Sequence, residues 1–102
     1  MTSPQLWKTW KVSDALLRRA RVALPNPDAE SKEEFARLDG QFAEMLDHNE
    51  HELALDFIEE MGLIAQPRGG FWKDLESTAE NMELVDRIPR IRSEFDKALS
   101  RI

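Results

Sequence analysis

The sequence predicts an all-α fold, a compact bundle of four to five short helices. Apolar residues recur at the spacing of a helix with one buried face along the whole chain. Alternation of β-branched and polar residues, which would indicate a strand, is not evident. Two clusters of helix-breaking residues, at 24–28 and 66–70, divide the helical stretches. The 102 residues suit one core, so we expect a single helical domain over 1–102.

The first helix is expected over residues 4–23. Apolar residues such as Leu17 and Ala20 recur on one of its sides. It ends at the sequence LPNPD, residues 24–28, because each proline restricts the residue before it and lacks a backbone donor. Its basic residues are scattered around the helix. That scatter favours ion pairs with the acidic helices over a nucleic-acid or membrane surface.

A second helix is expected to begin at Ser31, because Ser31 and Glu34 have the spacing of a capping box. A third helix is expected over residues 50–61 and should stop at Gly62, since glycine commonly follows the last helical residue. The joint between these two helices is short. We therefore expect them to pack as an antiparallel pair.

A fourth helix is expected after the breaker cluster at 66–70. Apolar residues from Phe71 to Val85 fall on one of its faces. A fifth helix should begin near Ile88, with Pro89 in its first turn, where the missing backbone donor is tolerated.

The carboxylates are concentrated in one third of the chain. Twelve of the twenty lie between Asp28 and Glu60, where Lys32 and Arg37 are the only opposing residues, so this third has a net charge of about −10. Such a field acts on partners and on association rates rather than on the fold. It argues against a nucleic-acid partner, because phosphate binding needs clustered Lys and Arg.

The chain contains no cysteine, which excludes disulfides, thiolate metal sites and cysteine nucleophiles. A reducing compartment suits such a chain, and we expect a cytoplasmic location. No stretch approaches the roughly 18 apolar residues that span a bilayer. Residues 1–10 also lack the pattern of a signal peptide, so we expect no membrane partner.

The third predicted helix carries an acidic stripe, with Leu53, Phe57 and their apolar neighbours expected on the opposite side. No Lys or Arg lies within this helix to offset the repulsion between like charges. The stripe is either a solvated face that keeps the protein soluble or a docking surface for a cationic partner. The candidate partner-binding residues lie in this helix and in the turn before it: Asp47, Glu50, Glu52, Asp56, Glu59 and Glu60.

His48 and His51 stand among carboxylates, which are the ligand types of a zinc centre. The predicted helix joint places them on either side of a turn, so we expect both to be exposed and predict no metal site. No nucleophile, base and orienting group occur at a recognisable spacing. We therefore predict neither catalytic residues nor a cofactor, and expect a protein that is not an enzyme.

Trp7, Trp10 and Trp72 each lie on the apolar side of a predicted helix. We expect at least two of them in the core. An exposed tryptophan near the N-terminus would be a candidate interface anchor, and Trp7 is the first to consider.

The segment LDHNEHELALD, residues 46–56, resembles a pattern common in small helical immunity proteins of bacterial polymorphic-toxin systems, including the Maf-associated group. The pattern there is Gly/Asn-Glu-x-Glu-Leu-Ala-Leu-Glu at a helix joint. The stretches FWKDL, residues 71–75, and AENM, residues 79–82, resemble a later helix of such proteins. The resemblance implies that this chain binds a cognate toxin domain and blocks it. Nuclease toxins have basic clefts, for which an acidic surface is a complementary partner.

Two alternatives remain open from the sequence. One is a non-inhibitory helical module, such as an adaptor, a secretion chaperone or a complex subunit, which would use an exposed apolar face around Trp7, Trp10 or Phe71. A self-complementary patch would make it a homodimer. The other is a metal-dependent enzyme, which a metal analysis of the purified protein would detect.

Overall fold

Five α-helices follow one another in the computed structural model, which describes residues 4–101 and the side chains from residue 9 onward. No strand occurs among these residues, so the predicted all-α fold is confirmed. None of the described helices is both long and apolar enough to cross a membrane. Two 3-10 turns, η1 (Ala29–Ser31) and η2 (Val85–Arg87), precede the second and fifth helices. The α-helices are α1 (Pro4–Val22), α2 (Lys32–Asp47), α3 (His51–Ala65), α4 (Gly69–Asn81) and α5 (Ile88–Ser100).

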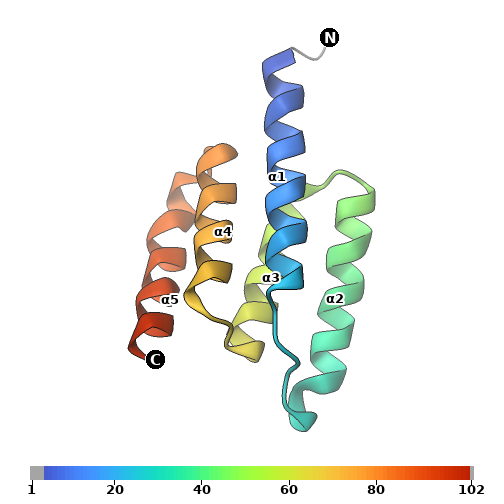
Figure 1. The fold of residues 1–102 in the computed structure, drawn as a ribbon. Coiled ribbons are helices and arrows are strands. Elements are labelled where there is room, and N and C mark those ends of the chain that lie inside the picture. The colour runs from blue at the N-terminus through green and yellow to red at the C-terminus, as the bar shows by residue number, and fades with distance from the viewer. Residues whose placement is uncertain (1–3, 102) are drawn as a thin grey trace.

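Successive helices run in opposite directions through the bundle (Figure 1). α2 packs along α3 as the predicted antiparallel pair, and α4 lies between α1 and α5. α1 crosses α3 in this view and packs against both α3 and α4. α3 therefore has neighbours on several sides, but one of its sides carries the exposed residues Leu53 and Leu63.

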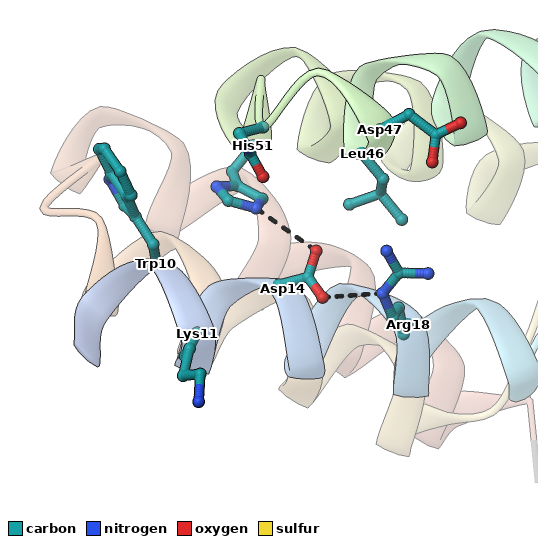
Figure 2. A pocket seen from close by; sticks show the side chains of 8 residues that line it. Trp10, Lys11, Asp14, Arg18, Leu46, Asp47 and His51 are labelled. Atoms are coloured by element: carbon teal, nitrogen blue, oxygen red, sulfur yellow. Dashed lines mark hydrogen bonds and ion pairs between the residues drawn. The ribbon is translucent and has the colours of Figure 1, made fainter. Parts of the chain in front are cut away.

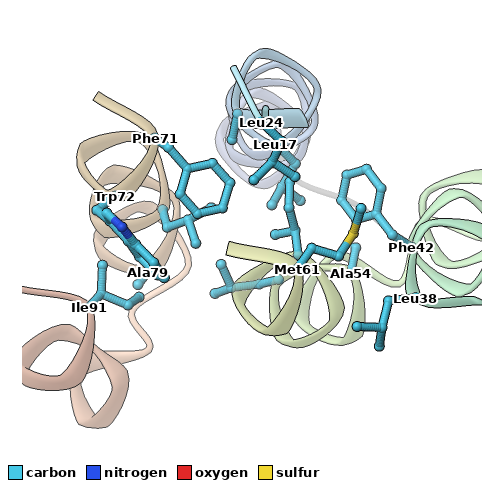
Figure 3. Close-up of a cluster of buried hydrophobic side chains, with 14 of the residues drawn as sticks. Leu17, Leu24, Leu38, Phe42, Ala54, Met61, Phe71, Trp72, Ala79 and Ile91 are labelled. Carbon is cyan, nitrogen blue, oxygen red and sulfur yellow. The ribbon is translucent and has the colours of Figure 1, made fainter. Parts of the chain in front are cut away.

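The core extends from the α2–α3 pair through α1 to α4 and α5 (Figure 3). Trp72 is fully buried, and its ring meets the ring of Phe71 edge-on at a centroid distance of 4.9 Å. Trp10 is 44% exposed and lies outside the core. The side chain of Trp7 lies outside the described residues. Other fully buried apolar residues come from all five helices: Leu17, Leu38, Leu55, Ile58, Leu75 and Ile91.

The two ends of α2 are formed in different ways. The helix begins one residue after Ser31, as predicted, but the Ser31 side chain makes no capping hydrogen bond. The 3-10 turn η1 leads into the helix instead. At the other end, Asn49 adopts a left-handed conformation with φ of 57°, and the amide of Glu50 donates to the carbonyl of Met45 at 2.8 Å. This is a Schellman end, and asparagine is one of the few residues that favours it.

α4 also stops at a Schellman end. Glu83 has φ of 59°, and the amide of Leu84 donates to the carbonyl of Ala79 at 2.8 Å. The expectation that the apolar face of this helix extends to Val85 is therefore wrong. Val85 begins η2 instead and is exposed.

α3 continues past Gly62 and ends at Ala65, so the predicted stop at Gly62 is wrong. The next residue, Gln66, has the left-handed conformation that closes the helix. Gly62 is instead a buried residue at the contact between α3 and the aromatic residues Phe71 and Trp72 of α4. Its role is close helix approach rather than helix termination.

Two arginines of α1 connect this helix to its neighbours. Arg19 donates to the carboxylate of Asp74 on α4, with one contact of 2.6 Å, and Arg21 donates to both oxygens of Asp39 on α2 at 2.8 and 2.9 Å. The expected pairing of the basic first helix with the acidic helices is confirmed for Arg21, whereas Arg19 pairs with α4, outside the acidic third of the chain. Because Arg19 is largely exposed, its pair contributes more to orientation than to stability.

A buried carboxylate on α4 predicts how the fold responds to acid. Glu76 accepts a hydrogen bond of 2.6 Å from Arg92 of α5, and this bond lowers the pKa of Glu76 below its ordinary value of 4.5. A lowered pKa contributes stability that is present above the unfolded-state pKa and is lost as pH falls through the folded-state pKa. We expect the melting temperature to fall below about pH 4.5, and to fall less in Glu76→Gln, which should be less stable at neutral pH. If the melting temperatures of the two proteins fell by the same amount as the pH is lowered, the role of Glu76 would be contradicted.

Candidate protein-binding surface

One side of α3 is open to solvent and carries apolar and acidic side chains together. Leu53 and Leu63 are 46% and 52% exposed, and Asp56 and Phe57 between them in the sequence are half-buried. With about 100° of rotation per residue, these four residues and the exposed Glu60 fall within an arc of about 120°. We call Leu53, Asp56, Phe57, Glu60 and Leu63 the outer α3 face.

The acidic stripe predicted on α3 is partly neutralised by η2. Arg87 lies 2.9 Å from a carboxylate oxygen of Glu52 and 2.8 Å from one of Asp56. Its side chain is largely buried, so these contacts also hold η2 against α3. The expectation of an unopposed stripe is therefore wrong at Glu52 and Asp56. Sequence reasoning missed the partner because Arg87 follows Glu52 by 35 positions.

Glu59 is also paired, and it is buried rather than exposed. Its carboxylate is 7% exposed and binds Arg90 of α5 through both oxygens, the second at 2.9 Å from Nη2. The Glu59 carboxylate raises the pKa of Arg90. Together with the outer α3 face, Glu59 and Arg90 line a shallow groove of about 490 Å³.

Three of the predicted carboxylates are exposed and unpaired. Within the part of the chain whose side chains are described, those of Asp47, Glu50 and Glu60 make no hydrogen bond or ion pair. Glu60 lies in the groove of the outer α3 face, whereas Asp47 lines a different hollow beside Trp10. Three of the six predicted residues, Glu52, Asp56 and Glu59, are thus bound to arginines. Glu60 and Glu50 are free, and Asp47 makes no direct contact but its charge raises the pKa of Arg18.

His51 is buried at the start of α3, contrary to the expectation that it is exposed, whereas His48 is exposed as expected. Its Nε2 lies 3.5 Å from Oδ1 of Asp14 on α1, and Oδ2 of Asp14 accepts a 2.7 Å hydrogen bond from Arg18 (Figure 2). Among the described residues, no group of three His, Cys, Asp or Glu side chains could hold a metal ion. His51 of α3 thus lies beside Asp14 of α1, but its buried Nε2 makes no hydrogen bond among the described residues.

The apolar part of the outer α3 face was not expected at this position. Leu53 and Phe57 were assigned to the side opposite the carboxylates, yet both line the groove beside Asp56 and Glu60. The helical angle gives the available signal, because Leu53 lies only about 60° from Asp56 around the helix. The boundary between the apolar and acidic sides is therefore gradual, and exposed leucines border the carboxylates.

Comparison of this chain with protein families, with curated proteins and with solved structures finds no match. The geometry and charge of the outer α3 face are the features that bear on function.

Proposed function

We propose that this protein binds a cationic partner domain on its outer α3 face and acts as an immunity protein that blocks a cognate toxin. The observation that carries the proposal is the combination on one open helix side of exposed Leu53 and Leu63 with the free carboxylate of Glu60. Protein interfaces commonly have an apolar centre surrounded by polar residues. The outer α3 face offers both kinds of contact, with the carboxylates of Asp56 and Glu60 lying between the exposed Leu53 and Leu63.

Charge supports a basic partner. The third of the chain that contains α2 and most of α3 has a net charge of about −10, and part of it remains exposed at Asp47, Glu50 and Glu60. A field of this sign steers a basic surface toward the protein and raises the association rate. The apolar residues of the groove then supply contact area that is not screened by salt.

Inhibition of this kind requires no chemistry from the binder. A domain that acts on nucleic acid presents a basic cleft, and an acidic helix seated in that cleft excludes the substrate. The sequence pattern at residues 46–56, which resembles immunity proteins, covers the α2–α3 joint and the start of the outer α3 face. The proposed interface therefore includes the segment that carries the resemblance.

A second candidate is a non-inhibitory helical module that uses α1. Trp10 and Val12 are exposed there, and Trp10 lines the hollow of about 670 Å³ that also includes His51. An exposed tryptophan is a frequent interface anchor. Phe71, which the sequence offered for the same role, is buried in the core.

Growth protection distinguishes the two candidates. We expect the chain to co-purify with a basic toxin domain encoded next to it in its genome, and its co-expression to restore the growth of cells that make the toxin domain. Trp10→Ser should protect equally well if the outer α3 face is the interface. Loss of protection in Trp10→Ser, or recovery of a regulatory or secretion complex without growth protection, would contradict the proposal.

A further inference from the structure

We propose that the partner places an arginine on Glu59 and that Arg90 occupies this position in the free protein. The inference rests on the proposed function and names the chemistry of the partner at the same surface. It follows from the difference in exposure between the two residues of the ion pair in the groove. The Glu59 side chain is 7% exposed, whereas that of Arg90 is 58% exposed. The carboxylate is buried in the protein, whereas the arginine that binds it is exposed to solvent.

The surroundings of Glu59 suit an incoming guanidinium group. Leu53, Phe57 and Leu63 line the same groove and can contact the stem of a long side chain or an apolar neighbour of it. Asp56 and the free Glu60 add negative charge at its edge. The occupant is therefore a basic segment of a partner that presents an arginine next to an apolar residue.

Exchange of one arginine for another avoids the main cost of using a buried carboxylate for binding. A buried carboxylate without a cation is strongly unfavourable. If Glu59 had no cation bound before the partner arrived, the free protein would be destabilised. Arg90 satisfies both carboxylate oxygens until the partner arrives. Arginine suits the exchange better than lysine, because its planar group binds both oxygens at once.

Chemical rescue tests the inference with the full chain. We expect Arg90→Ala to melt roughly 5 °C or more below the wild type. Millimolar guanidinium chloride, far below denaturing concentrations, should recover at least half of this loss relative to the same concentration of sodium chloride. It should not raise the melting temperature of the wild type, whose site is filled, or of Glu59→Gln/Arg90→Ala, whose carboxylate is absent.

Arg90→Lys provides a second variant if Arg90→Ala does not fold, because it keeps the charge but loses the two-pronged contact. We expect Arg90→Lys to be partly destabilised and guanidinium to restore its stability. If guanidinium has no more effect than sodium chloride on the variant that folds, Glu59 does not accept an external guanidinium and the inference is overturned. Growth protection does not depend on this result, so the inference and the proposed function fail separately.

Discussion

Gly62→Ala is expected to lower the free energy of unfolding by about 1–3 kcal/mol, although alanine is the better helix former. A Cβ atom at this position would lie 2.8 Å from Cζ of Phe71 and 2.9 Å from Cη2 of Trp72. Both rings are buried and have no free space into which to move, so α3 and α4 must separate or the rings must leave their preferred positions. The melting temperature should fall by about 4–8 °C for each kcal/mol.

Gly40→Ala is the matched control, because Gly40 is exposed within α2 and a Cβ atom there would meet nothing within 4 Å. This change should stabilise the protein by roughly 0.5–1 kcal/mol through helix propensity alone. The melting temperatures of the two variants distinguish the effect of side-chain packing on stability from the effect of helix propensity. Equal stabilisation by both changes would show that the close contact of Gly62 with the aromatic rings does not limit the side chain at that position.

Leu53→Ser/Leu63→Ser is expected to weaken binding of the cationic partner at least tenfold, about 1.4 kcal/mol. The two side chains are about half exposed, so their loss removes apolar contact area from the groove but leaves the core intact. Val85→Ser is the control, since Val85 is exposed on η2 outside this groove. Calorimetric titration measures all three proteins. If the affinity of the double variant were unchanged, Leu53 and Leu63 would not be part of the interface.

The number and approximate positions of the helices could be predicted because they depend on local signals. The proline-rich segment at 24–28, the breaker cluster at 66–70 and Pro89 each restrict their own backbone, and the helices end or begin beside them. Where a local signal was ambiguous, the prediction was wrong. Gly62 has the residue type of a helix stop, but the approach of α4 determines its role.

The state of charge of the candidate site could not be predicted, because it depends on residues distant in the sequence. Arg87 and Arg90 offset two of the three negative charges of Glu52, Asp56 and Glu59 only because α4 and its Schellman end return the chain to α3. Periodicity places a residue on a helix side but does not identify what packs there. The tertiary structure alone shows that Glu60 stays unpaired while Glu52, Asp56 and Glu59 bind arginines.

The affinity of the cationic partner for two charge-reversed proteins tests the outer α3 face most directly. Glu60→Lys reverses the free carboxylate on this face, and Asp96→Lys makes the same change in net charge at an exposed residue of α5. Asp56 and Glu59 are unsuitable for reversal, because they bind Arg87 and Arg90.

We expect the first variant to lose at least about tenfold in affinity at low ionic strength, with its helical circular dichroism unchanged, and the second to lose less than about threefold. Equal losses in the two variants would mean that net charge, and not this face, determines binding. An unchanged affinity of the first variant would show that the partner binds elsewhere.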